Sequence, residues 1–204
     1  MGEAKTLVCT GGIGSGKSYV SEVFSALGIP VYYSDRRAKE LYAESRQLLE
    51  AVAEVAGADI IASDGTLKKA VLASRIFSSG EMLAKVEALV HPAVDADFQL
   101  WKESRSADLV LFESAIYLEK PSLSHIADYV LTVTAAEEVR IARVMERDHC
   151  AREKALERIA NQWSDAQRIE KSDFIIRSGA GEPILPQVIE IIGIIKNGKN
   201  ENRS

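Results

Sequence analysis

The sequence predicts an α/β protein whose five-stranded parallel sheet is flanked by helices, and three observations support this class. Short apolar runs typical of buried strands alternate along the chain with longer segments of helical periodicity, as in doubly wound parallel sheets. The first run leads into a glycine-rich turn at residues 11–16 that opens a helix. A strand-poor stretch, residues 36–104, separates the second run from the third and predicts an inserted helical lobe.

Composition places the chain among globular proteins with a sizeable core. Hydrophobic residues make up 47% of the 204 residues and charged residues 27%, which is typical of one domain with insertions. The formal net charge of −5 argues against a general nucleic-acid binder, which usually carries a basic excess. No apolar run of about 18 residues occurs, so we expect no membrane span.

Two features favour a reducing cytoplasm. The two cysteines, Cys9 and Cys150, suggest neither a disulfide framework nor a zinc site. The first residues lead directly into the first strand without the apolar segment of a signal peptide.

The first strand is expected at residues 6–10 and is followed by a phosphate-loop motif. Gly11 to Ser18 read GGIGSGKS, which fits the pattern G-x-x-x-x-G-K-[ST]. Glycines let successive backbone N–H groups turn toward one anion, and the next helix adds the free N–H groups of its N-terminus. Lys17 can then reach the β- and γ-phosphates, while the Ser18 hydroxyl can bind Mg²⁺. A chance glycine turn would lack this strand–loop–helix context. The predicted nucleotide-binding residues are Gly12, Ile13, Gly14, Ser15, Gly16, Lys17, Ser18 and Tyr19.

The helix after the loop is expected to end near Leu27, because Gly28 and Pro30 favour a stop there. Residues 30–33 then predict a short second strand. Asp35 follows the carboxyl end of that strand. Ligands of open α/β sheets bind at this edge, so Asp35 is expected on the same edge as the phosphate loop.

Three helices are expected in the inserted lobe. Apolar residues at helical spacing predict the first: Leu41, Leu48, Leu49, Val52 and Val55. A second helix is expected at residues 67–77. Ser78 and Glu81 have the spacing of a capping box and predict the start of a third helix. Pro92 lies inside this third helix and predicts a kink near His91.

The C-terminal half returns to alternating strands and helices. Strands are expected at residues 108–112, 129–133 and 174–176, and helices at 134–148, 150–163 and 184–196. Residues 108–112 form an unbroken apolar run, which predicts the central strand of the sheet. Thr134 and Glu137 again have capping-box spacing and predict the start of the following helix.

Asp35 fits two roles equally well on spacing alone. A carboxylate beside the phosphates could orient an acceptor hydroxyl and take its proton. An Asp after a strand could equally cap the helix that follows.

Four arginines gather around the end of one helix and the start of the next: Arg140, Arg143, Arg147 and Arg152. The first three share one helix face. Such a face could be a solvated, ion-paired surface, or it could supply the arginines of a lid that balance charge during phosphoryl transfer. The Arg147-Asp148 pair at the expected helix end favours the lid. His91, by contrast, lacks a neighbouring nucleophile or carboxylate in the sequence, and a structural role beside Pro92 is favoured.

Several motifs match one known family. Residues 10–18 fit its opening motif, and Tyr33-Ser34-Asp35 takes the place of its Asp-Ala-Asp stretch, with only the second acid kept. Leu89-Val90-His91-Pro92 is similar to a Leu-x-His-Pro signature. Arg143-x-x-x-Arg147-Asp148 is similar to its lid, and Gln162 to the Gln that closes the lid helix. Over residues 6–186 the chain resembles the dephospho-coenzyme A kinase family, whose members have a P-loop kinase fold.

The resemblance implies roles for individual residues. It makes Asp35 the base acting on a ribose 3′-hydroxyl, and it places Lys39, His91 and Glu113 with Asp35 in the acceptor site. Lys39 stands where the family usually has Arg. The sequence departs from the family at Tyr19, where Thr is usual, and at Arg177-Ser178-Gly179, where the family has Asp-Asn-x-Gly with its Asn near the adenine.

The sequence therefore predicts a kinase that uses ATP and Mg²⁺ to phosphorylate dephospho-CoA. Lys17, Asp35, Arg143 and Arg147 are the predicted catalytic residues. The expected organisation is one domain, residues 1–196, with a core (1–35, 105–142 and 170–196), an acceptor lobe (36–104) and a lid (143–168), followed by a disordered tail (197–204). A monomer or weak homo-oligomer is expected.

Two alternatives remain at this stage. Another nucleotide or small-molecule kinase would share everything except the acceptor lobe. A non-catalytic GTPase-type switch would need an Asn-Lys-x-Asp guanine-binding tetrapeptide, which does not occur in this chain.

Overall fold

The computed structural model describes the backbone of residues 4–201 and the side chains of residues 4–198. Their contacts divide the chain into two compact units. The sheet unit comprises Met1–Tyr32 and Ser106–Ser204, and the helical unit comprises Tyr33–Arg105. No helix among the described residues is long and apolar enough to cross a bilayer.

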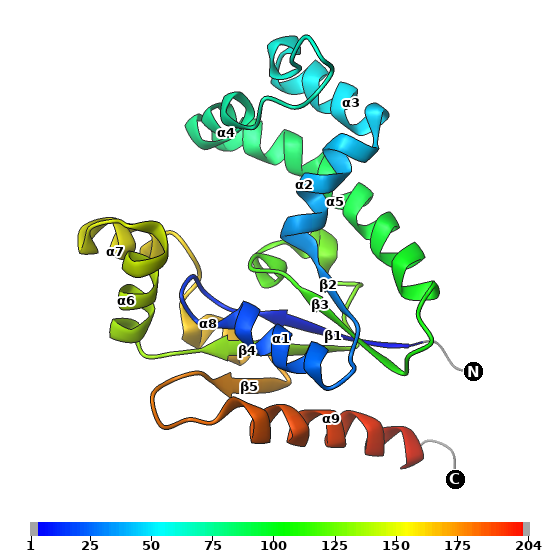
Figure 1. Cartoon of the computed structure of the whole chain (residues 1–204), viewed down its shortest axis with the longest axis vertical. Coiled ribbons are helices and arrows are strands. Elements are labelled where there is room, and N and C mark those ends of the chain that lie inside the picture. Colours follow the sequence, from blue (N-terminus) through cyan, green and yellow to red (C-terminus); the bar gives the residue numbers. More distant parts are fainter. Residues whose placement is uncertain (1–3, 202–204) are drawn as a thin grey trace. The chain divides into compact units, whose positions relative to one another are not determined.

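A five-stranded parallel sheet with the order β2-β3-β1-β4-β5 confirms the predicted fold class (Figure 1). The strands are β1 (Lys5–Thr10), β2 (Val31–Tyr33), β3 (Leu109–Glu113), β4 (Tyr129–Thr134) and β5 (Phe174–Arg177). The prediction that residues 108–112 form the central strand was wrong, because β1 holds that position. Both strands lie between two neighbours and are buried on both faces, so their apolar runs look alike in the sequence.

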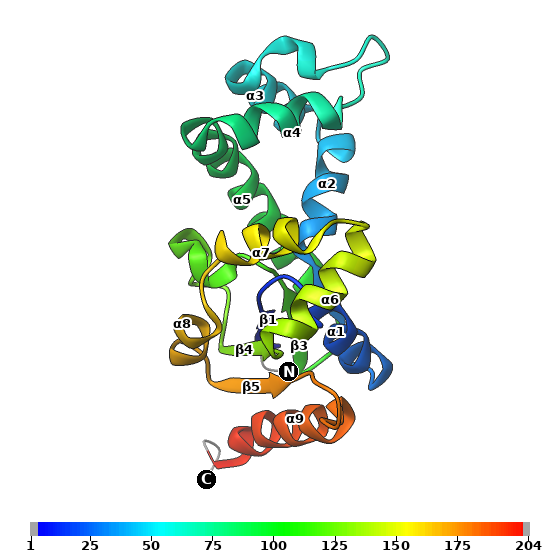
Figure 2. The same cartoon turned by 90° about the vertical axis from the view of Figure 1, so that its left-hand side faces the viewer.

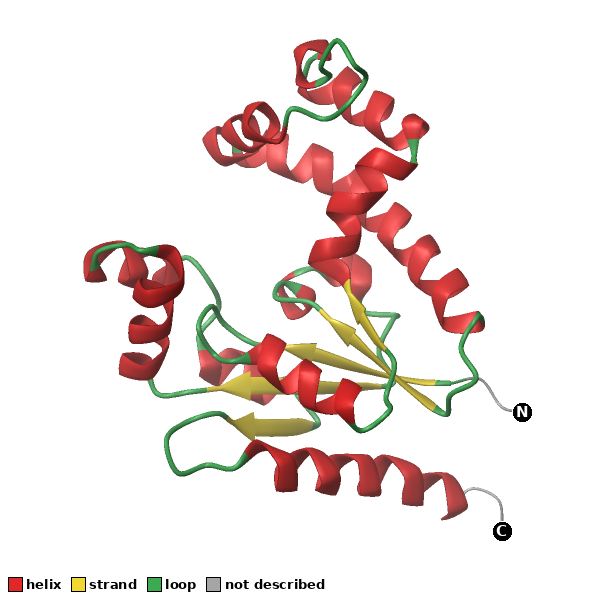
Figure 3. Ribbon diagram, viewed as in Figure 1, coloured by secondary structure: helices red, strands yellow, loops and turns green. Residues whose placement is uncertain are grey.

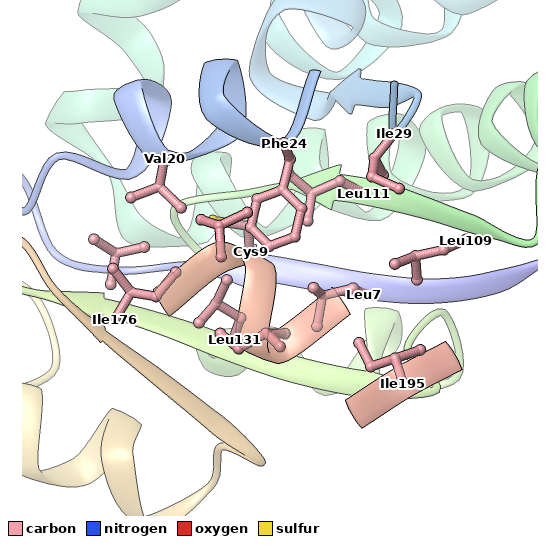
Figure 4. Close-up of a cluster of buried hydrophobic side chains, with 13 residues drawn as sticks. Leu7, Cys9, Val20, Phe24, Ile29, Leu109, Leu111, Leu131, Ile176 and Ile195 are labelled. Atoms are coloured by element: carbon pink, nitrogen blue, oxygen red, sulfur yellow. The ribbon is translucent and has the colours of Figure 1, made fainter. Parts of the chain in front are cut away.

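Alternate residues of the sheet face α1 (Lys17–Ala26) and α9 (Ile184–Glu201) and form a core with them (Figure 4). Leu7 and Leu131 come from neighbouring strands, Phe24 from α1 and Ile195 from α9. Because Phe24 is fully buried, the helix that begins at the phosphate loop is fixed on the sheet. The loop is therefore held by packing at its helical end.

Three further helices belong to the sheet unit: α6 (Glu137–Asp148), α7 (Arg152–Ala160) and α8 (Asp165–Glu170). Helices α6 and α7 pack against each other (Figure 2). Short 3-10 turns lie at η2 (Tyr117–Glu119) and η3 (Pro121–Leu123). The last helix, α9, continues to Glu201 rather than ending at residue 196, and the final residues of the predicted tail, 202–204, lie outside the described residues.

Helix starts in the sheet unit differ from the prediction. Helix α6 has no side-chain cap, and the Thr134 hydroxyl is used instead in a hydrogen bond to Asp165. The unpredicted helix α8 carries the genuine capping box, formed by Ser164 and Gln167. The Ser-x-x-Gln pattern was readable in the sequence, but it begins a helix of only one and a half turns, which has almost no periodicity to detect.

The helical unit contains α2 (Ser34–Glu44), α3 (Arg46–Ala56), α4 (Lys69–Ser78), α5 (Gly80–Glu103) and the short turn η1 (Ala58–Ile60) (Figure 3). The predicted first helix is split, because Ser45 is extended and caps α3 by accepting a hydrogen bond from the Leu48 amide. Helix α5 is capped by Ser79 rather than Ser78. It also continues through Pro92 without ending. A proline in a helix removes one hydrogen bond, and packing against α2, α3 and α4 supports the remainder of α5.

Ion pairs fasten the helices of this unit to one another. Arg37 of α2 donates to both carboxylate oxygens of Asp97 on α5, at 3.1 and 2.9 Å, and also binds Glu44 on its own helix. Arg75 of α4 donates to the Ala56 carbonyl at the end of α3 and to Asp59 at 2.5 Å. These contacts give α2 and α5, which carry the predicted acceptor residues, a fixed arrangement within the unit.

Candidate functional site

The phosphate loop has the backbone that its glycines predict. Gly14 and Gly16 both have left-handed φ angles, 77° and 91°, which glycine adopts without strain. Gly16 is the N-cap of α1, and a Cβ added to it would lie only 2.5 Å from the Ser178 hydroxyl. The loop therefore turns directly onto the N-terminus of α1, where free N–H groups and the positive end of the helix dipole favour an anion.

Lys17 is held by an ion pair with Glu113. Glu113 is the last residue of β3, opposite Cys9 of β1 in the sheet register. Both side chains are largely buried, with exposed fractions of 13% for Lys17 and 5% for Glu113. This ion pair fixes the Lys17 side chain against the carboxyl end of β3. The structure thus places Glu113, a predicted acceptor-site residue, beside the residue predicted to bind phosphate.

Ile13, inside the phosphate loop, is held at both of its backbone polar atoms, which belong to two successive peptide groups. Gln162, between α7 and α8, accepts a 2.7 Å hydrogen bond from the Ile13 amide. Arg140 of α6 donates through Nε to the Ile13 carbonyl at 3.0 Å. Arg140 also pairs with Asp165 at 3.0 Å, and Asp165 accepts the Thr134 hydroxyl. Arg140 is buried, so the helical spacing that grouped it with the lid arginines misplaced it.

Arg143, one turn further along α6, also contacts the loop backbone. It donates to the Gly14 carbonyl at 3.2 Å, and to the hydroxyl and carbonyl of Ser178 at 3.0 and 2.8 Å. Ser178 follows β5, in the segment that departs from the family pattern. Arg143 therefore joins the phosphate loop to the segment after β5.

Arg147, at the end of α6, differs from both. Its side chain is 61% exposed and donates to the two carboxylate oxygens of Asp148 at 2.8 and 2.9 Å. The Arg147 guanidinium holds the pKa of Asp148 below its usual value. Arg158 of α7 pairs with the same carboxylate. His149 then ends α6 in the left-handed conformation, with φ of 48°. Arg147 is thus the most exposed of the three arginines on this face of α6, and its guanidinium is paired with Asp148.

The remaining loop residues differ in exposure, and the Ser15 side chain is buried. Ser18 and Tyr19 are exposed in the first turn of α1. No cluster of three or more His, Cys, Asp or Glu side chains able to hold a metal occurs among the described residues.

The other predicted acceptor residues belong to the helical unit. Asp35 and Lys39 are both exposed on α2 and are four residues apart, so they share a helix face. Helix α2 has no side-chain cap, because its N-cap is Tyr33. The alternative in which Asp35 caps the following helix is therefore wrong. His91 lies in α5 and is partly buried.

Comparison with known proteins identifies the family to which the chain is related. The sequence profile of the dephospho-CoA kinase family matches residues 6–182. The chain belongs to this family. It is 38% identical over 193 residues to a dephospho-CoA kinase of Porphyromonas gingivalis, an alignment that covers 94% of each chain. It is 33% identical over 187 residues to a dephospho-CoA kinase of Bacteroides fragilis, covering 91% of this chain and 90% of the relative.

A solved structure agrees with the family assignment. The fold superposes on TT1252 from Thermus thermophilus with a TM-score of 0.82 and 26% sequence identity, covering 94% of this chain and 97% of that one. The similarity spans both units of the chain.

The sequence predicted the loop, but it did not predict what supports the loop. Gln162 was noticed only as a family match, and Asp165 and Ser178 were missed. The one local signal was the Ser164-x-x-Gln167 capping box, which fixes where α8 begins and so where Asp165 lies.

Proposed function

We propose that this chain transfers the γ-phosphoryl group of ATP to the ribose 3′-hydroxyl of dephospho-CoA, giving CoA and ADP in the last step of CoA biosynthesis. The observation that carries the proposal is the complete phosphate loop, whose Lys17 is paired with Glu113, in a chain of the dephospho-CoA kinase family.

On the donor side, the loop amides and the N-terminus of α1 bind the β- and γ-phosphates. To contact these phosphates, Lys17 breaks its ion pair with Glu113 or shares its charge between Glu113 and the phosphates. This contact neutralises the negative charge that builds up as the phosphoryl group moves. Arg147, exposed at the end of α6, adds a second positive charge from the lid. Arg143 contributes by holding the loop at Gly14.

On the acceptor side, Asp35 orients the 3′-hydroxyl and takes its proton as the oxygen attacks phosphorus. Lys39, on the same face of α2, binds an anionic group of the acceptor. His91 shapes the acceptor pocket from α5. Closure of the lid excludes water, and this suppresses ATP hydrolysis.

Magnesium fits the oxygen donors that the loop offers. The Ser18 hydroxyl is exposed in the first turn of α1, and Mg²⁺ typically takes one or two protein oxygens together with phosphates and waters. A site of this type needs no cluster of protein carboxylates. When bound, the ion supplies charge neutralisation across the β- and γ-phosphates.

We further propose that the enzyme works in the cytoplasm, as a monomer or weak homo-oligomer. Both cysteines are free, which suits a reducing compartment.

A panel of acceptors tests the proposal. Purified protein with ATP and Mg²⁺ is given dephospho-CoA, AMP, CMP or shikimate, and ADP and product formation are measured. We expect kcat/KM for dephospho-CoA to exceed that for every other acceptor by at least ~10³-fold, the scale reached when a site hydrogen-bonds a specific substrate. Preference for a nucleoside monophosphate would contradict the proposal and favour a nucleotide kinase.

A further inference from the structure

The phosphate loop is held from outside at the two peptide groups that flank the Cα atom of Ile13. Gln162 Oε1 accepts from the Ile13 amide, which belongs to the Gly12–Ile13 peptide, at 2.7 Å. Arg140 Nε donates to the Ile13 carbonyl, which belongs to the Ile13–Gly14 peptide, at 3.0 Å. Each hydrogen bond restricts the orientation of one peptide plane. The Gly14 amide lies in the same plane as the Ile13 carbonyl, so its direction is set as well.

The segment that supplies this grip is itself fixed. Ser164 and Gln167 form the capping box of α8, with hydrogen bonds of 2.9 and 3.2 Å. The Arg168 guanidinium is buried, binds the Trp163 carbonyl and pairs with Glu119 at 2.6 Å. Gln162 therefore projects from a rigid support rather than from a mobile loop.

Arg140 lies against the loop at a place where only glycine fits. A Cβ added to Gly12 would lie 2.9 Å from Cζ of Arg140, with one guanidinium nitrogen closer still. Arg140 has Asp165 as its ion-pair partner, and its buried Nη2 atom has no hydrogen-bond partner. A buried donor without a hydrogen-bond partner lowers the stability of the folded state. The Arg140 guanidinium also places a positive charge against the loop that is proposed to bind phosphates.

We propose that Gln162 is a positioning residue, which together with Arg140 and Asp165 holds the two peptides on either side of Ile13 in the orientation that binds the triphosphate. Gln162 also joins the end of α7 to the loop, so it couples the lid segment to phosphate binding. The kinetic part of the proposal rests on the proposed function. The binding part requires only that the loop binds a nucleotide.

The test compares Gln162→Leu, which keeps size but removes the acceptor, with Asn161→Ala, an exposed neighbour. For Gln162→Leu we expect the dissociation constant of ADP and the KM for ATP to rise about tenfold, the effect of one lost hydrogen bond. The KM for dephospho-CoA should stay unchanged. Amide hydrogen exchange at Ile13, followed by NMR without nucleotide, should accelerate at least tenfold. Asn161→Ala should change none of these.

Gln162→Glu separates positioning from simple folding. It keeps an oxygen acceptor for the Ile13 amide but adds a negative charge beside the phosphates. We expect Ile13 exchange to stay slow while ADP binding weakens about tenfold or more. If Gln162→Leu fails to fold, Gln162→Asn carries the test, because its shorter side chain withdraws the acceptor from the Ile13 amide. Unchanged ADP affinity and unchanged Ile13 exchange in that variant would overturn the proposal.

Unchanged ADP affinity and unchanged Ile13 exchange in a folded Gln162→Leu protein would also overturn it. Failure of the proposed function gives a different result, since the wild-type protein would then make no CoA while the ADP and exchange measurements would still respond to Gln162.

Discussion

The donor and acceptor sides of this enzyme differ in how their site residues are held. In the sheet unit, Lys17 is paired with Glu113 and Arg140 with Asp165, and all but Asp165 of these four are nearly buried. In the helical unit, Asp35 and Lys39 stand exposed on one face of α2. The phosphate site is thus built from contacts that exist without ligand, whereas the predicted acceptor groups meet solvent until a substrate arrives.

This difference predicts which property, stability or substrate kinetics, a substitution on each side should change. Donor-side changes break existing contacts, so they should alter stability or the kinetics of ATP. Acceptor-side changes remove exposed groups that are proposed to contact substrate, so they should leave stability intact and alter turnover or the kinetics of dephospho-CoA. The following predictions run from the largest expected effect to the smallest.

Arg140→Ala should give the largest effect. It leaves Asp165 without its buried partner and frees the Ile13 carbonyl, and breaking such a pair typically costs about 3–5 kcal/mol. For a chain of this size, we expect the melting temperature to fall by roughly 6–20 °C, measured by calorimetry. Arg147→Ala is the control, because Arg147 is exposed and should change the free energy of unfolding by no more than about 0.5 kcal/mol. An equal fall in melting temperature in the two variants would contradict the claim that Arg140 supports the fold and Arg147 does not.

Lys17→Ala should damage catalysis through the donor. Removing a charge that stabilises the transferring group typically lowers kcat by about 10²–10³-fold, and the KM for ATP should rise because a phosphate contact is lost. The KM for dephospho-CoA should stay within about twofold in steady-state assays. A change confined to the acceptor KM would place Lys17 on the wrong side of the reaction.

Asp35→Asn should separate binding from chemistry on the acceptor side. The variant keeps shape and loses the base, so kcat should fall by about 10²-fold or more, while ATP affinity and melting temperature stay near the wild-type values. Glu50→Gln, a surface change in the same unit, is the matched control. Near-normal turnover of Asp35→Asn would remove Asp35 from the mechanism.

The donor unit should also show a pH signature, which begins at a lower pH than the one expected from Tyr42 of the helical unit, whose pKa burial raises from 10.0 to about 12. Burial in β1 raises the pKa of the Cys9 thiol from 9.0 to about 11. The unfolded chain therefore loses this proton first as pH rises, so the stability contributed by the neutral thiol is complete below pH 9 and declines between pH 9 and 11. Relative to Cys9→Ala, the free energy of unfolding should fall by up to roughly 2–3 kcal/mol over this range. Parallel pH profiles of the two proteins would contradict the burial argument.

Lys39→Ala should have the smallest effect. Loss of one exposed charge that contacts substrate should raise the KM for dephospho-CoA about tenfold, or roughly 1.4 kcal/mol, without altering kcat or the KM for ATP. Lys85→Ala is a suitable control, because Lys85 is an exposed lysine of the same unit, paired only across one helical turn with Glu81 in a weak surface bridge. An equal rise in the KM for dephospho-CoA in both variants would mean that the effect comes from the change in net charge and not from a contact made by Lys39.

The same contrast explains how far the sequence could be used for prediction. The alternation of strands and helices and the spacing of Gly11 to Ser18 are local patterns, and both the sheet and the loop were predicted from them. The order of the strands in the sheet does not follow from local sequence patterns. The prediction therefore placed β3 in the centre, although β1 lies there. Capping was predicted one residue early at Ser78, because Glu81 lies three residues after Ser78, whereas Ser79 is the N-cap and accepts a hydrogen bond from the Met82 amide without a capping box.

The support of the site escaped prediction for a related reason. Arg140, Arg143 and Arg147 share a helix face, and the spacing gives all three the same role. The structure separates them by burial: Arg140 lies under the loop, Arg143 holds Gly14, and Arg147 is exposed. The bond from the Ile13 amide to Gln162 joins residues 149 positions apart, which no local pattern encodes.

The central claim is that the donor and acceptor sides together move a phosphoryl group from ATP to the ribose 3′-hydroxyl of dephospho-CoA. Purified protein, Mg²⁺, γ-labelled ATP and dephospho-CoA test it directly, with the product identified by chromatography and phosphorus NMR. We predict label transfer to one product, CoA carrying a 3′-phosphate, with one ADP formed for each CoA. Release of ADP and free phosphate without CoA, or a phosphate at another position of the acceptor, would contradict the claim.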